Sequence, residues 1–159
     1  DLDTVMPGIS LYDFGDLDWD RLERLSTDLT NKFADVNRVL LVLRPDNFDF
    51  VNVVPGYLTR ERIDLLQKAD KISMSAIMKA GLEKEIWQFP TVLLPILVNN
   101  RGSESVVLRP VCSEEAMTAN FYKMPEEILN ALVSEMTGLD LSGIFYDITN
   151  KPPGTIEWE

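Results

Sequence analysis

Three helical patterns alternate with short apolar runs along this chain, and the alternation limits it to folds that combine helices with a sheet. In residues 18–33 the apolar side chains repeat at the spacing of one helical face: Leu22, Leu25, Leu29 and Phe33. Residues 59–80 and 125–137 carry similar patterns, with Gly81 and Gly138 placed where helices end. We therefore expect three amphipathic helices, each of which needs an apolar surface to cover.

Four apolar runs predict the strands of that surface. Residues 39–43 have the composition of a strand buried on both faces. Residues 89–98 and 104–112 flank a turn-forming stretch, which predicts a hairpin, and residues 144–148 form the fourth run. The predicted fold is α+β, a mixed β-sheet of about four or five strands with helices mainly on one face. Residues 46–56 are expected to form a loop.

Composition removes several classes of function. The chain has no histidine, and Cys112 is its single cysteine, so histidine-based metal sites, triads and disulfides are excluded. A net charge of −11 argues against a nucleic-acid or anionic membrane surface. We expect no catalytic or metal-binding residue in this chain, and a cytoplasmic location. The start at Asp1 indicates a piece of a longer protein.

The last nine residues combine features of a strand with features of a binding segment. Ile156 and Trp158 alternate with polar residues, as in a half-buried strand. Lys151 supplies a cation suited to phosphate, and Gly154 lets backbone approach a ligand closely. The residues alone leave two interpretations open, which are a final edge strand and an anion-binding tail.

Two polar residues stand within apolar surroundings. Arg109 alternates with Leu108, which favours an exposed face, although a counter-charge or a ligand would also explain an arginine there. Gln88 lies between two aromatic residues. Its amide is able to read a purine-like ring, or to satisfy strand backbone, as such amides more often do.

Residues 146–159 resemble the extreme C-terminus of glutamine-hydrolysing GMP synthases. Residues 106–109 with 116–118, and residues 67–70 with 89–95, are similar to the same region. Before Thr59 the chain resembles the long form of that family, whose C-terminal region holds two related dimerisation repeats. On this resemblance, residues 1–45 are the trailing helix–strand unit of a preceding repeat. Residues 46–159 are the dimerisation domain, and the two parts pack as one unit.

The resemblance implies the C-terminal domain of an enzyme that converts XMP to GMP with ATP and glutamine. This domain would contribute to XMP binding and to homodimerisation, and the fragment alone would be inactive. ATP and Mg²⁺ would act in an ATP-pyrophosphatase domain beside a glutamine amidotransferase domain, and this fragment would bind no cofactor. The XMP or GMP nucleotide would meet residues that match family positions: Lys151, Glu157, Gln88, Thr155 and Ile156, with Arg109 as a further candidate.

One position departs from the family pattern. The family usually has an arginine eight residues before the tail lysine, where this chain has Gly143, and the equivalent position of the first repeat holds Arg38. Loss of a phosphate contact would weaken binding, since one charge-assisted hydrogen bond contributes about 1.5–3 kcal/mol. The alternative function is therefore a degenerate or stand-alone dimerisation module that binds no nucleotide.

Overall fold

The fold is given by a computed structural model that describes residues 17–47, 49–113 and 117–158. The acidic stretch before residue 17, the Glu114-Glu115 pair and Glu159 lie outside the described residues. In the described residues no helix has both the length and the apolarity needed to cross a membrane.

The three helices form where the apolar spacing predicted them. α1 (Trp19–Lys32) begins after Asp18, whose side chain accepts a hydrogen bond from the Arg21 backbone N–H. α2 (Arg60–Ala80) ends at Gly81, which has a φ of 69°, a conformation that glycine adopts without strain. α3 (Glu126–Met136) follows Pro125 directly. The apolar spacing in residues 59–80 also predicts that Ile63 belongs to the buried stripe of α2. Ile63 is 36% exposed, so that prediction was wrong.

A four-stranded mixed sheet forms the centre of the fold, as predicted. Its order is β1 (Leu40–Arg44), β8 (Leu141–Asp147), β5 (Glu104–Leu108) and β3 (Thr91–Leu94). The central pair, β5 and β8, is parallel, and both outer pairs are antiparallel. β1 comes from the part of the chain predicted as a preceding repeat, yet it pairs with β8 in the same sheet. The domain division itself stays a prediction.

Prolines divide two of the predicted strands because they cannot donate to a strand ladder. Pro95 separates β3 from β4 (Ile96–Val98), which turns away to pair with β2 (Val51–Val53). Pro110 separates β5 from β6 (Val111–Cys112), which pairs with β7 (Asn120–Phe121). The strand β2 lies within the segment expected to be a loop, so that prediction was wrong in part.

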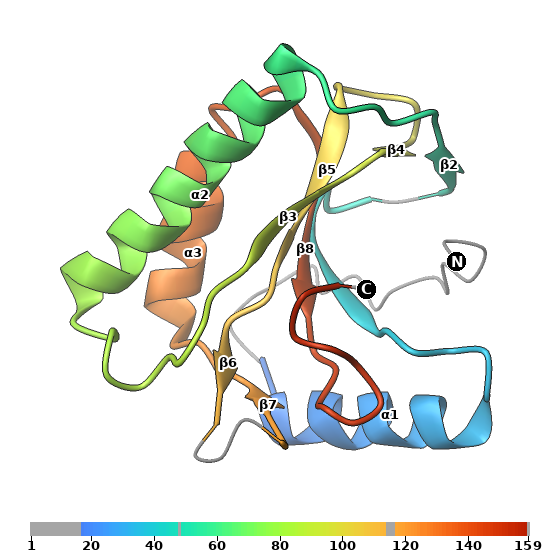
Figure 1. The fold of residues 1–159 in the computed structure, drawn as a ribbon, viewed down its shortest axis with the longest axis vertical. Coiled ribbons are helices and arrows are strands. Elements are labelled where there is room, and N and C mark those ends of the chain that lie inside the picture. Colours follow the sequence, from blue (N-terminus) through green and yellow to red (C-terminus); the bar gives the residue numbers. More distant parts are fainter. Residues whose placement is uncertain (1–16, 48, 114–116, 159) are drawn as a thin grey trace.

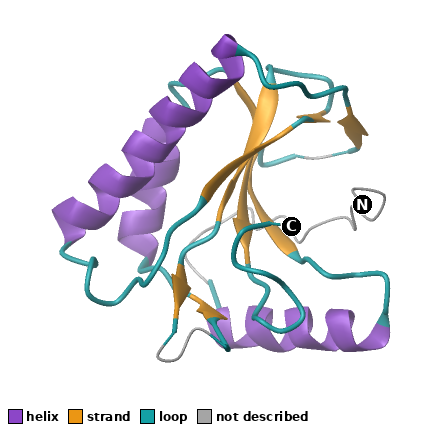
Figure 2. Ribbon diagram, viewed as in Figure 1, coloured by secondary structure: helices purple, strands orange, loops and turns teal. Residues whose placement is uncertain are grey.

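The two faces of the sheet are covered differently. α2 and α3 pack on one face, and α1 crosses below one end of the sheet (Figure 1; Figure 2). The core on the helical face includes Leu41, Leu108, Tyr146 and Leu129. The opposite face carries a smaller cluster with Val42, Val107 and Phe145, against which Trp158 packs. The chain end after β8, drawn in dark red, therefore folds back onto the face without helices (Figure 1).

Candidate functional site

A buried carboxylate, that of Asp147 at the end of β8, is the centre of the candidate site. Its Oδ2 atom lies 2.7 Å from Arg109 Nη1 and 3.0 Å from Arg38 Nη1, so two guanidinium groups share one carboxylate. Asp147 also accepts hydrogen bonds from the Thr149 backbone N–H and from Trp158 Nε1. The side chains of Asp147 and Arg109 are fully buried, and that of Arg38 is 10% exposed.

The expectation that Arg109 lies on an exposed face was wrong. Its Nε donates to the Ile156 carbonyl and its Nη1 to the Thr149 carbonyl, each at 3.1 Å. Burial lowers the pKa of the Arg109 guanidinium, while the Asp147 charge opposes that effect. Of the interpretations of Arg109, the structure therefore supports pairing with a counter-charge and not exposure to solvent. Arg109 also contacts the tail, which we define as residues 148–158.

Arg38 also contacts the tail. Its Nη2 donates to Thr155 Oγ1 at 2.6 Å, and its guanidinium carbon lies 5.0 Å from the centre of the Trp158 ring. A Cβ added at Gly154 would lie 3.1 Å from Arg38 Nη1, so glycine lets the backbone pass close to this arginine.

The strand period explains why these three residues meet. Arg38 is two residues before Leu40, which is paired with Asp147, and Arg109 lies two residues after Val107, which is paired with Phe145. Alternate residues of neighbouring strands share one face, so Arg38, Asp147 and Arg109 project from the face without helices. Our sequence reasoning missed Asp147. The sequence does contain a signal, because Asp147 is a single carboxylate at the end of an apolar run. Two arginines occupy the matching strand positions on the neighbouring strands.

Of the two interpretations of the tail, the structure does not show the final edge strand, because residues 152–158 are held by bends and side-chain contacts. Ile156 is buried against Val111 and Ala119, and its carbonyl accepts from Arg109. The structure thus supports neither regular pairing nor a free end for residues 152–158. The side chains of Thr155 and Ile156, both predicted XMP contacts, face the protein.

The remaining predicted contacts lie around the β6–β7 pair. The backbone of Gln88 pairs with Val111, and the backbone of Lys151 pairs with Ala119, which directly precedes β7. Gln88 and Lys151 therefore lie on opposite sides of the β6–β7 pair. Glu157 is exposed, and Lys151 and Gln88 are partly exposed. Their predicted contact with XMP stays a prediction.

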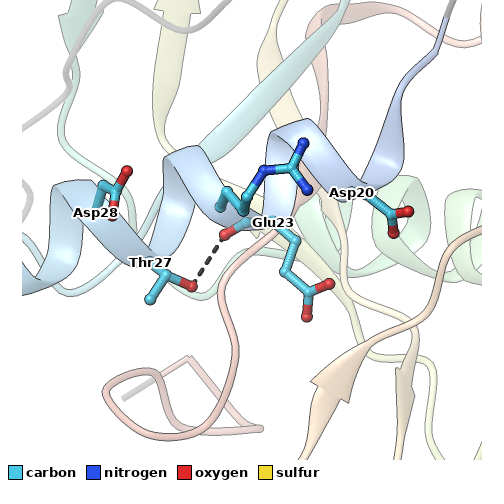
Figure 3. Close-up of a pocket in the computed structure, with 5 residues that line it drawn as sticks. Asp20, Glu23, Thr27 and Asp28 are labelled. Atoms are coloured by element: carbon cyan, nitrogen blue, oxygen red, sulfur yellow. Dashed lines mark hydrogen bonds between the residues drawn. The ribbon is translucent and has the colours of Figure 1, made fainter.

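A pocket on α1 lies next to the tail but carries the wrong charge for a phosphate. It is lined by Asp20, Glu23, Arg24, Thr27 and Asp28 (Figure 3). Glu23 accepts from the side chain of Asn150, which precedes the tail lysine, and both Asp20 and Glu23 pair with Lys123. The hydrogen bond from Lys123 lowers the pKa of both carboxyl groups, so they stay ionised. The hydrogen bond between Glu23 and Asn150 attaches α1 to the tail.

Gly143, the position that departs from the family pattern, lies on the face of the sheet without helices. It is in β8 four residues before Asp147, which is about 13 Å along an extended strand. A Cβ there would lie 2.9 Å from Val98 Cγ2 and 3.0 Å from Ser105 Oγ, so the position is filled by neighbouring side chains. An arginine at this position would require these side chains to move.

Fold and site together define an α+β domain whose C-terminal tail is fastened to the sheet by buried arginines. The chain belongs to the family described as "GMP synthase C terminal domain", which matches residues 75–158. It is 45% identical over 148 residues to a probable glutamine-hydrolyzing GMP synthase of Leptospira interrogans, a match that covers 89% of this chain and 24% of the relative.

Other relatives match a shorter part of the chain. The glutamine-hydrolyzing GMP synthase of Streptomyces coelicolor is 43% identical over 115 residues, covering 67% of this chain and 22% of the relative. That of Phenylobacterium zucineum is 44% identical over 116 residues, with similar coverage of 67% and 22%. The chain thus spans about a quarter of the length of the curated relatives it matches.

Proposed function

We propose that this chain is the C-terminal domain of a GMP synthase, in which it contributes to XMP binding and to homodimerisation. The larger enzyme would use ATP and glutamine to convert XMP to GMP, with its other domains supplying the chemistry and holding ATP and Mg²⁺. Membership of the family supports the assignment to a GMP synthase. The contacts that hold the tail support the proposed contact with the nucleotide.

The single observation that carries the binding proposal is the fixed course of the tail between Lys151 and Glu157. Arg38 and Arg109 hold Thr155 and Ile156, which lie between those two residues. A tail held in one shape loses less conformational entropy when a ligand binds than a free chain end does. In this proposal Lys151 balances the nucleotide phosphate, and Glu157 accepts hydrogen bonds from the base or the ribose.

Replacing Lys151 or Glu157 with alanine in the full-length enzyme is expected to raise the KM for XMP by about 10-fold to 100-fold. Either change removes one charge-assisted hydrogen bond, which contributes about 1.5–3 kcal/mol. Steady-state kinetics with XMP and ATP varied separately measure the effect. Lys84→Ala, at an exposed lysine away from the tail, is the control and should leave the KM unchanged. An unchanged KM for XMP in both tail variants would refute the site.

The homodimerisation proposal is supported by apolar side chains exposed before and at the start of α2. Tyr57 and Leu58 are 74% and 88% exposed, and Val53 and Phe50 are also exposed. Neighbouring apolar side chains in solvent mark contact surfaces between proteins. Light scattering of the full-length enzyme is expected to report a dimer, and Leu58→Asp is expected to shift it toward the monomer. A monomer at high concentration without the substitution would contradict the proposal.

The alternative, a dimerisation module without nucleotide binding, rested on Gly143. Gly143 lies in β8, four residues before the buried Asp147. The parent reading frame discriminates between the two functions. An upstream pyrophosphatase loop and amidotransferase cysteine would exclude the stand-alone module.

A further inference from the structure

The tail contains a strained residue. Trp158 has a φ of 55°, in the left-handed region that bulky side chains avoid. Such a conformation persists only where the surrounding structure holds it, and it is typical of functional sites. Two contacts hold Trp158, namely the hydrogen bond from its Nε1 to Asp147 and the guanidinium of Arg38 over its ring.

The arginine cluster that contacts the tail leaves one buried nitrogen atom without a hydrogen bond in the part of the chain that the structure describes. Among the described residues Arg109 Nη2 is buried and has no hydrogen-bond partner, although its Nε and Nη1 both donate to tail carbonyls. A buried polar atom without a partner destabilises a fold and calls for an explanation. The carbonyl groups of Thr149 and Ile156 orient the guanidinium through Nη1 and Nε. In this orientation the third nitrogen, Nη2, has no partner among the described residues.

We propose that Arg38, Asp147 and Arg109 are positioning residues for nucleotide binding, which fix the tail backbone so that Lys151 and Glu157 face the same ligand. They contact Thr149 before Lys151, Thr155 and Ile156 between Lys151 and Glu157, and Trp158 after Glu157. Arg109 and Asp147 are fully buried and act through the tail. The inference rests on the proposed function, because it explains how the XMP contacts are held.

Arg38 is the residue to test, because it is slightly exposed and its loss leaves the buried Arg109–Asp147 pair intact. In the full-length enzyme Arg38→Ala is expected to raise the KM for XMP about tenfold, because a loosened tail loses more conformational entropy when the ligand binds. The kcat and the KM for ATP should stay within about twofold. Hydrogen exchange of peptides covering residues 150–158 should become faster.

The matched control is Arg62→Ala. Arg62 Nε forms a partly buried ion pair with Glu104 at 2.9 Å, similar to the 3.0 Å pair of Arg38, at a position in α2 away from the tail. This variant should change neither the KM for XMP nor the exchange of residues 150–158. Equal effects in both variants would show a general loss of stability and overturn the positioning role.

Arg38→Lys separates positioning from direct contact with the ligand. A lysine keeps the positive charge but cannot bridge Asp147 and Thr155 with two nitrogens as Arg38 does. A positioning role predicts that Arg38→Lys restores neither the slow exchange of the tail nor the KM for XMP. Recovery of the KM with the tail still exchanging fast would overturn the proposal.

The Lys151→Ala variant distinguishes a failure of the positioning role from a failure of the proposed function. If Lys151→Ala weakens XMP binding and Arg38→Ala does not, the proposed function stands and the positioning role fails. If neither Lys151→Ala nor Glu157→Ala changes the KM for XMP, the proposed function fails first.

Discussion

Replacing Asp147 with alanine is expected to lower the free energy of unfolding of the chain by about 3–5 kcal/mol. The carboxylate is fully buried between Arg38 and Arg109, and its removal leaves both guanidinium groups without their counter-charge. The hydrogen bonds from Trp158 Nε1 and the Thr149 N–H are lost as well. Urea denaturation followed by far-ultraviolet circular dichroism measures the change.

Asp64→Ala is the matched control for that variant. Asp64 also pairs with an arginine, Arg60 at 3.0 Å, but on the exposed surface of α2. Exposed pairs contribute about 0.2–1 kcal/mol, so the control should unfold nearly as the parent does. Similar losses in the two variants would contradict the structural importance assigned to the buried cluster.

Introducing the family arginine at position 143 is expected to destabilise the chain by about 3 kcal/mol or more, because it overpacks the sheet and buries a charge. The new side chain would meet Val98, Ser105 and Phe145 at the face of β8. Gly143→Arg is therefore expected to lower the urea midpoint strongly. In the full-length enzyme it should not lower the KM for XMP.

Gly138→Arg is the control for this substitution. Gly138 is exposed after α3, and the nearest atom to an added Cβ is the Glu135 carbonyl oxygen at 3.4 Å. An arginine there should change the free energy of unfolding by less than about 1 kcal/mol. A Gly143→Arg protein that is as stable as the parent and binds XMP more tightly would refute our placement of Gly143.

Helix boundaries could be predicted from the sequence because caps are local signals. Asp18 and Thr59 begin α1 and α2, and Gly81 ends α2, all as expected. The positions of the sheet strands were also predictable, because their apolar runs have no other place to be buried. The separate β2–β4 and β6–β7 pairs were not, since they depend on where Pro95 and Pro110 redirect the chain.

The tail was recognisable from its sequence, but its conformation was not. Alternation of apolar and polar residues in 155–159 predicted a strand, yet in residues 155–158 contacts with Arg38, Arg109 and Asp147 replace regular pairing. The role of Arg109 depended on a partner far along the chain. A single strand pattern shows which face a side chain occupies, but not whether that face is covered.

The position of β8 in the sheet has a consequence for how the protein is made. β8 is the last strand among the described residues, yet it lies between β1 and β5, and Arg38 and Asp147 are 109 residues apart. Until β8 leaves the ribosome, β1 lacks its neighbour and the β3–β5 hairpin has an open edge. Contacts between distant residues form slowly because a long loop must first close. The four-stranded sheet and its arginine cluster can therefore be completed only after β8 has been synthesised.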